Sequence, residues 1–206
     1  MEVFASLPEK TRSLLEELEQ KDREERNAEL PKEVRLRQIP RVTGLFLYHL
    51  LLTHVPRFGP TFNGLEVGTS GGYSTIWQAL SLSHLGFGLL QSLDVDPSKT
   101  EMAQRNISAA NLGSYVRLQN EDLGSFIASN LSSPLHYVFL DAEKEDYVRH
   151  FQLVKPKLVR GGLLVADNVV SHGEDMKDFL TLLPTDPDVM ASIIDVGKGL
   201  ALVTKL

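Results

Sequence analysis

The chain has 206 residues, 42% of them hydrophobic and 23% charged, and its formal net charge is -6 at pH 7. This length and composition predict one globular domain with a short appendage and exclude a disordered chain. The absence of cysteine excludes disulfide bonds and thiolate metal sites. The acidic balance argues against nucleic acid as a partner. We expect a cytoplasmic location and no membrane partner, because neither a signal-peptide pattern nor an apolar run of membrane-spanning length is found.

The first 36 residues are predicted to form a helical extension, which is followed by a main domain over residues 37–206. Residues 8–30 have an amphipathic pattern, and their charged end is expected to be exposed or to pack on another subunit. Pro31 and Pro40 interrupt the next segment, and a second helix is expected after Pro40. Five leucines are assigned to the buried part of that second helix: Leu45, Leu47, Leu50, Leu51 and Leu52. Three arginines are interpreted as a solvated helix edge: Arg35, Arg37 and Arg41.

From residue 63 onward, short apolar runs alternate with helical segments. The apolar runs are residues 65–67, 88–95, 115–118, 137–140 and 162–166. The helical segments between them are residues 74–82, 98–111 and 123–130, and a further helix is expected after each of the last two runs. This alternation predicts a mostly parallel α/β sheet with helices on both faces. The last two runs, 189–196 and 200–204, predict an antiparallel hairpin that closes the sheet.

A glycine-rich turn follows the first of these strands, with the sequence Glu66-Val67-Gly68-Thr69-Ser70-Gly71-Gly72. Ligands of such sheets bind beyond the carboxyl ends of the strands, and glycines let the backbone come close to a ligand. The turn alone also fits any mononucleotide or a tight bend. Glu66 at the strand end would repel a phosphate and attract an ammonium group. We therefore favour a ligand with a cationic amino-acid part, such as S-adenosylmethionine, over a dinucleotide.

Two further carboxylates follow the second and third strands. Asp94 is placed to accept hydrogen bonds from two ribose hydroxyls, and Asp122 from an adenine amino group. Both have an alternative interpretation, because aspartates at these positions also serve as turn residues or helix caps. Asp96-Pro97 in particular is suited to begin the next helix.

Oxygen ligands follow two later strands. Asp141 ends one strand and Asp167-Asn168 ends the next. If the strands are neighbours, their ends lie about 5 Å apart, and two carboxylates with an amide oxygen converge there. Such a set suits a hard cation, Mg²⁺, Mn²⁺ or Ca²⁺, with positions left for water and a substrate. The alternative is that both aspartates only cap the helices that follow them.

These segments resemble the cation-dependent small-molecule O-methyltransferases, a family that includes the catechol and caffeoyl-CoA O-methyltransferases and many bacterial relatives. The resemblance extends from Arg37 to the C-terminus and rests on residues 66–74, Asp94, residues 141–147 and residues 161–169. It implies a Rossmann-like fold of seven strands with a reversed last strand. It also implies a metal-assisted transfer of a methyl group from S-adenosylmethionine to a phenolic small molecule, by a homodimer.

The resemblance assigns roles to individual residues. It implies that the cofactor is bound by Glu66, Gly68, Ser70, Ser74, Asp94, Asp122 and Asp141. It implies that the metal ligands are Asp141, Asp167 and Asn168, and that Lys144 is the general base that takes the acceptor's proton. Asp141 and Lys144 are thus the predicted catalytic pair. His172 either borders the acceptor pocket or lies on the surface.

The chain also departs from the family pattern. The segment after Asn168 lacks the tryptophan and glycine of the plant caffeoyl-CoA enzymes, and the acidic substrate-orienting residue of the animal catechol enzyme has no match near Asp195. The acceptor therefore stays open among catechols, caffeoyl-type phenols, flavonoids and other vicinal diols. Two other functions are compatible with parts of the sequence: a nicotinamide-dependent oxidoreductase, which the glycine spacing disfavours, and a non-catalytic cofactor-binding module, which the intact Asp141 and Lys144 disfavour.

Overall fold

A computed structural model describes residues 3–129 and 134–206. Its helices are α1 (Val3–Ser6), α2 (Glu9–Asn27), α3 (Arg41–His54), α4 (Tyr73–Leu85), α5 (Pro97–Ala109), α6 (Leu123–Ser129), α7 (Tyr147–Val154) and α8 (Lys177–Leu182). Its strands are β1 (Asn63–Val67), β2 (Leu89–Asp94), β3 (Val116–Asn120), β4 (Leu135–Leu140), β5 (Leu158–Ala166), β6 (Val189–Ile194) and β7 (Leu200–Lys205). Short 3-10 turns are η1 (Val55–Arg57), η2 (Gly59–Thr61), η3 (Lys144–Asp146), η4 (Lys155–Lys157) and η5 (Leu183–Thr185).

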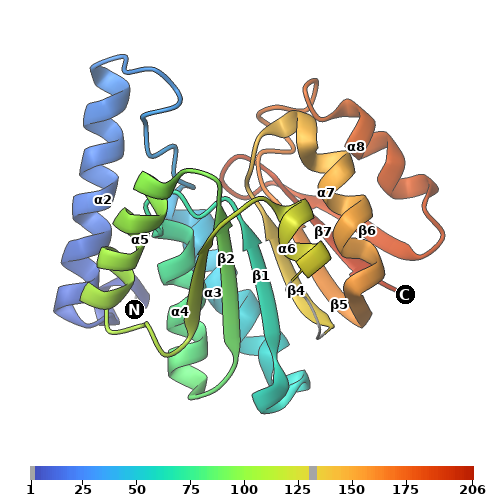
Figure 1. The fold of residues 1–206 in the computed structure, drawn as a ribbon, viewed down its shortest axis with the longest axis horizontal. Coiled ribbons are helices and arrows are strands. Elements are labelled where there is room, and N and C mark those ends of the chain that lie inside the picture. The colour runs from blue at the N-terminus through green and yellow to red at the C-terminus, as the bar shows by residue number, and fades with distance from the viewer. Residues whose placement is uncertain (1–2, 130–133) are drawn as a thin grey trace.

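The seven strands form one sheet in the order β3-β2-β1-β4-β5-β7-β6 (Figure 1). Strands β1 to β5 pair in parallel, whereas β7 runs antiparallel to both β5 and β6. The predicted mostly parallel sheet, its helix-strand alternation and its closing hairpin are therefore confirmed. The predicted helix over residues 123–130 is confirmed as far as Ser129, and its last residue lies outside the described ranges.

Helices α2 to α5 cover one face of the sheet and α6 to α8 cover the other (Figure 1). Strand β4 contributes side chains to the hydrophobic cores on both faces of the sheet. Tyr137 and Phe139 belong to the core under α3 and α4, whereas Val138 and Leu140 belong to the core under α7. Side chains alternate between the two faces of a strand, so a continuous apolar run is what a strand buried on both faces requires.

The N-terminal helix α2 packs into the core of the main sheet. Leu15 and Leu18 are buried in the same cluster as Trp77, the only tryptophan, which is fully buried as expected. In α3, Leu47 and Leu51 are buried, and the other three leucines assigned to its buried part are half-buried. None of the helices within the described ranges is long and apolar enough to cross a membrane.

Residues 31–39, here called the strap, connect α2 to α3 without helical structure. Pro40 disfavours the helical conformation at the residue before it, and α3 begins only at Arg41. The interpretation of the three arginines as a helix edge is therefore wrong for Arg35 and Arg37, which lie in the strap. The strap reaches the carboxyl edge of the sheet, where it lines the main cavity.

Candidate active site

A cavity of about 810 Å³ lies at the carboxyl edge of the sheet. The register pairs Val67 with Leu140 and Leu140 with Ala166, so the residues after β1, β4 and β5 emerge side by side. The backbone N–H of Asp141 donates to the carbonyl of Val67 over 3.0 Å, which extends this pairing into the turns. The glycine-rich turn and the two predicted metal ligands Asp141 and Asp167 therefore follow neighbouring strands at the carboxyl edge, as the sequence predicts.

The glycine-rich turn is tied to β2 through its backbone. The N–H of Ser70 donates to Oδ2 of Asp94 over 2.7 Å. Gly68 has a φ of 103°, and a Cβ there would lie 2.3 Å from the carbonyl oxygen of Asp141. Glycine is required because β1 and β4 approach each other closely at their ends and because L side chains rarely adopt this φ. The turn leaves Gly68, Ser70 and Ser74 on the cavity wall.

Glu66 lies below that wall and has no exposed surface. Its carboxylate accepts hydrogen bonds of 2.5 to 2.6 Å from four side chains: Ser74, Thr75, Gln78 and Ser92. Burial raises the pKa of Glu66, and these four donors oppose the rise. Glu66 is not among the residues that line the cavity. It can therefore influence a ligand only through a neighbour such as Ser74, which lines the cavity and donates to Glu66.

Asp94 and Asp122 both line the cavity. Oδ1 of Asp94 accepts the backbone N–H of Asp96 over 2.9 Å, and Oδ2 accepts that of Ser70. Each carboxylate oxygen has a further lone pair for a ligand hydroxyl. Asp122 accepts the N–H groups of Gly124 and Ser125 and so caps α6. The hydroxyl of Ser125 also donates to Asp122 and holds its pKa below the usual range. Asp96 caps α5 through Ser98, as its Asp-Pro sequence indicated.

Asp141, Asp167 and Asn168 form one cluster, in which Asp141 and Asn168 line the cavity and Asp167 lies buried behind them. Nδ2 of Asn168 donates to Oδ1 of Asp141 over 2.9 Å and to Oδ2 of Asp167 over 3.0 Å. Asp167 has no exposed surface, and its Oδ1 has no hydrogen-bond partner in the described part of the chain. Burial and the nearby charge of Asp141 raise the pKa of Asp167.

This cluster fits a hard divalent cation. A buried carboxylate oxygen without a partner is costly, and a second carboxylate beside it adds repulsion that a cation would remove. A half-turn of the Asn168 side-chain amide would present its oxygen in place of the nitrogen, and the two atoms are assigned from the hydrogen bonds. The set contains two carboxylates and one amide. No group of three or more His, Cys, Asp or Glu suited to a metal occurs within residues 3–129 and 134–206.

Lys144 lies beside this cluster, in the short turn η3. Its Nζ donates to Oδ1 of Asp141 over 3.2 Å and to the carbonyl of Ala142 over 2.9 Å. The hydroxyl of Tyr147 lies 3.4 Å from the same Nζ and donates to the carbonyl of Leu140 over 3.0 Å. Lys144 is thus held at the cavity by the residues around it, and 17% of its side chain is exposed.

The sequence did not predict that most of the strap and the tip of the last hairpin would line the cavity. The strap contributes Arg35, Leu36, Arg37 and Gln38 to the cavity wall, and Lys198 enters from the hairpin. Pro31 and Pro40 marked the strap as irregular, but no residue pattern placed it over the sheet edge. His172 is exposed, in agreement with the surface interpretation, and it also lines the cavity, so its place beside the acceptor stays a prediction.

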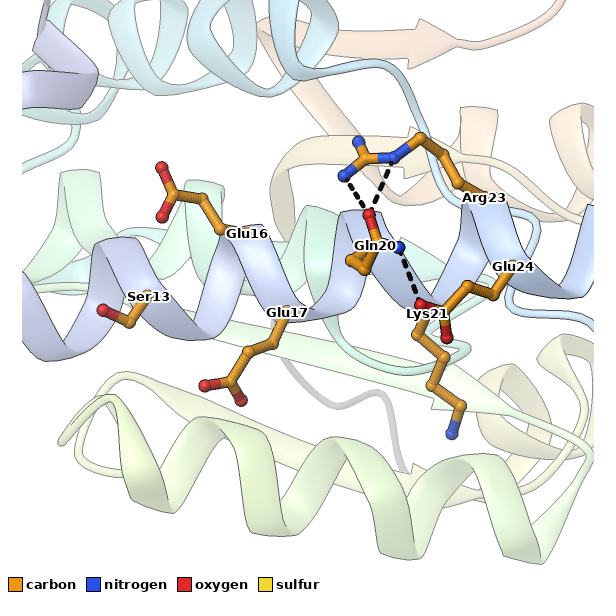
Figure 2. A pocket seen from close by; sticks show the side chains of 7 residues that line it. All are labelled: Ser13, Glu16, Glu17, Gln20, Lys21, Arg23 and Glu24. Carbon is orange, nitrogen blue, oxygen red and sulfur yellow. Dashed lines mark hydrogen bonds between the residues drawn. The ribbon is translucent and has the colours of Figure 1, made fainter.

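A second depression lies on α2 alone (Figure 2). Its side chains are Ser13, Glu16, Glu17, Gln20, Lys21, Arg23 and Glu24. Gln20 pairs with Glu24 and Arg23 along this exposed surface. Because one helix supplies every residue of the depression, no groups converge there from different elements, and it has no part in the site.

The fold and the cavity define a Rossmann-like methyltransferase architecture. The chain matches the model of the O-methyltransferase family over residues 14–206, and it belongs to that family. A catechol O-methyltransferase of Niastella koreensis is 37% identical over 115 residues, which cover 54% of this chain and 51% of the relative. The chain thus aligns with about half the length of this relative.

Solved structures share the whole architecture. An O-methyltransferase from Bacillus cereus, in complex with SAH, is 27% identical, with a TM-score of 0.75 over 94% of this chain and 91% of the other. TomG from Streptomyces achromogenes, an O-methyltransferase in complex with SAM, is 25% identical, with a TM-score of 0.75 over 91% of this chain and 88% of the other. The expected family and fold are therefore confirmed.

Proposed function

We propose that this protein transfers a methyl group from S-adenosylmethionine to one hydroxyl of a small phenolic vicinal diol, with the help of a divalent cation. The observation that carries the proposal is that Asp141, Asn168 and Lys144 line the cavity that the glycine-rich turn also lines, with the buried Asp167 hydrogen-bonded to Asn168 behind its wall. The family match and the SAH and SAM complexes of similar structures support the choice of cofactor.

The cofactor is assigned to the half of the cavity between β1 and β2. Asp94 would accept the ribose hydroxyls, and Asp122 lies farther along the same edge, after β3. Gly68, Ser70 and Ser74 would surround the amino-acid part, with Glu66 acting from beneath through Ser74. Asp141 is the member of the metal-ligand cluster that is hydrogen-bonded to β1 through Val67, so it would border both the cofactor and the cation.

In the reaction, the methyl carbon leaves sulfur and bonds to the acceptor oxygen, and sulfur keeps the electron pair of the broken bond. A bound Mg²⁺, Mn²⁺ or Ca²⁺ would lower the pKa of the acceptor hydroxyl. Asp141, Asp167 and Asn168 would hold that cation, and Lys144 would accept the proton that the hydroxyl loses. The cavity wall would hold the two reactants in line, which accounts for much of the rate enhancement in such transfers.

Transfer of labelled methyl groups from S-adenosylmethionine to a panel of ortho-diphenols tests the proposal, with and without a chelator. We expect transfer that the chelator abolishes and that Asp167→Ala lowers by at least about a hundredfold, because the cation would lose a buried ligand. Asp178→Ala, on the exposed side of α8, serves as the matched control. Transfer that neither the chelator nor Asp167→Ala affects would contradict the role of the cation.

A homodimer and a cytoplasmic location stay predictions. For the dimer, light scattering of the purified protein gives the test, and a monomeric mass at micromolar concentration would contradict it. The oxidoreductase alternative predicts protection against thermal unfolding by NAD but not by S-adenosylmethionine, and the same preparation can be used to compare the two ligands.

A further inference from the structure

Lys198 forms the tip of the hairpin between β6 and β7, where Gly197 and Gly199 flank it. Its carbonyl accepts the N–H groups of Val170 and Ser171 over 3.2 and 3.0 Å. These two residues follow the metal-ligand segment that ends at Asn168. The tip of the hairpin is therefore fixed to the loop that follows the metal-ligand cluster.

The two flanking glycines allow this close approach. A Cβ on Gly197 would lie 2.1 Å from Oγ1 of Thr43 in α3, and one on Gly199 would lie 2.2 Å from Cγ2 of Val170. Both glycines also have φ in the left-handed region, 64° and 87°. The tip is thus wedged between α3 and the loop after β5, and Lys198 is the one residue of the tip that has a side chain.

The side chain of Lys198 is half-buried and lines the cavity. Within the described ranges its ammonium makes no hydrogen bond and no ion pair. Two other cations that line the cavity have carboxylate partners, since Lys144 pairs with Asp141 and Arg37 pairs with Glu143. Lys198 and Asn168 line the same cavity, and the backbone of the hairpin tip is hydrogen-bonded to the loop that follows Asn168.

We propose that Lys198 determines substrate specificity by binding the carboxylate of an acidic acceptor, a dihydroxy aromatic acid. The inference rests on the proposed function, which places the two adjacent hydroxyls at Asp141, Asp167 and Asn168. An acidic substituent on the same ring must then avoid these carboxylates and reach a cation that has no partner. Lys198 meets both conditions, since β4 and β5 separate its hairpin from the strand that leads into the glycine-rich turn, and the wedged tip holds it in place.

A matched pair of acceptors tests the inference: 3,4-dihydroxybenzoate and its methyl ester, which differ in one negative charge. We expect the wild type to prefer the acid in kcat/KM by about tenfold or more, as a partly buried charge pair would give. Lys198→Met should remove this preference by lowering kcat/KM for the acid while leaving the ester within about twofold. Lys198→Arg should restore part of it, and Lys177→Met on α8 is the control.

Equal losses for acid and ester in Lys198→Met would assign Lys198 a structural role and overturn the inference, and so would a wild type that prefers the ester. Calorimetric titration of the acid into the protein with SAH and Mg²⁺ gives a readout that does not depend on turnover. Weaker binding of the acid to Lys198→Met supports the inference, and equal binding overturns it. Failure of the proposed function has a different signature, because neither the acid nor the ester would then be methylated by the wild type.

Discussion

The carboxylate of Glu66 has no exposed surface and accepts hydrogen bonds from three side chains of α4 and from Ser92 of β2. No cation contacts it within the described ranges, so neutral donors alone compensate its burial. The strand-end position predicted a residue that attracts a cationic ligand directly. The buried network instead indicates that Glu66 fixes the first turn of α4 and, through Ser74, the wall of the cavity.

Substitution of Glu66 separates these two roles. A glutamine can keep the network, because the hydroxyls of Thr75 and Ser92 can turn to accept from its Nε2. We expect Glu66→Gln to bind SAH within about threefold of the wild type, whereas Glu66→Ala leaves several buried donors unpaired and loses about 3 to 5 kcal/mol of stability. Calorimetric titration with SAH and urea unfolding measure the two effects. A loss of SAH affinity greater than tenfold in Glu66→Gln would show that the charge itself attracts the cofactor.

Site residues could be predicted from the sequence where a strand end fixes their position. Asp141 and Asp167 directly follow buried apolar runs and Asp94 is the last residue of β2, and parallel strands place such residues along one edge. The contacts of Glu66 could not be predicted in this way, because they depend on the rotation of α4 over the sheet. The position of Lys198 at the cavity could not be predicted, because a Gly-Lys-Gly turn does not indicate which other elements the turn packs against.

At the scale of elements, the strap is held over the cavity from both sides. Nζ of Lys99 in α5 donates to the carbonyls of Val34 and Arg35, at 2.9 Å each. The hydroxyl of Ser70 donates to the carbonyl of Leu36 over 2.6 Å, and Arg37 pairs with Glu143 across the cavity. The sheet and its helices followed from periodic apolar patterns, whereas the strap has no periodicity, and single long-range contacts determine its path.

Among the residues that contact the strap, Lys99 should affect its position most when substituted, because Lys99 is buried and its ammonium donates to two carbonyls. We expect Lys99→Met to loosen the strap, to speed tryptic cleavage after Lys32 and Arg35, and to weaken SAH binding by about three- to tenfold, as the loss of one or two hydrogen bonds implies. Saturating SAH should restore part of the protection. Lys177→Met is again the control, and an unchanged cleavage pattern in Lys99→Met would mean that other contacts hold the strap.

At the scale of the molecule, contacts between α2 and the helices on the sheet determine whether α2 unfolds with the sheet or before it. Glu19 of α2 receives two hydrogen bonds from Arg41 of α3, at 2.8 and 2.6 Å, and one from Tyr73 of α4 at 2.6 Å. Together with Leu15 and Leu18 in the common core, these contacts join the extension to the main domain. The division into residues 1–36 and 37–206 stays a prediction, and the structure suggests how to test it.

The dependence of stability on acid pH distinguishes unfolding of α2 together with the sheet from unfolding of α2 before the sheet. Burial raises the pKa of Glu19, but the hydrogen bonds from Arg41 and Tyr73 outweigh burial and hold the pKa below its ordinary value of 4.5. A lowered pKa in the folded state gives stability that is present above the unfolded pKa and is lost as the pH falls through the folded pKa. Because Arg41 is 38% exposed, solvent weakens the pair, and we expect Glu19→Gln to cost only about 1 kcal/mol at pH 7.

Urea unfolding of the wild type, Glu19→Gln and the exposed control Glu17→Gln should be followed by Trp77 fluorescence and by circular dichroism. If α2 unfolds together with the sheet, both signals shift together. The deficit of Glu19→Gln then shrinks as the pH falls below the ordinary pKa of 4.5 and through the lower folded pKa, below which Glu19 is protonated in both states. An early loss of helical signal before the change at Trp77 would instead make the extension a separate unit. That result would also separate the strap from the core on its N-terminal side, so cofactor affinity should then fall in Glu19→Gln as well.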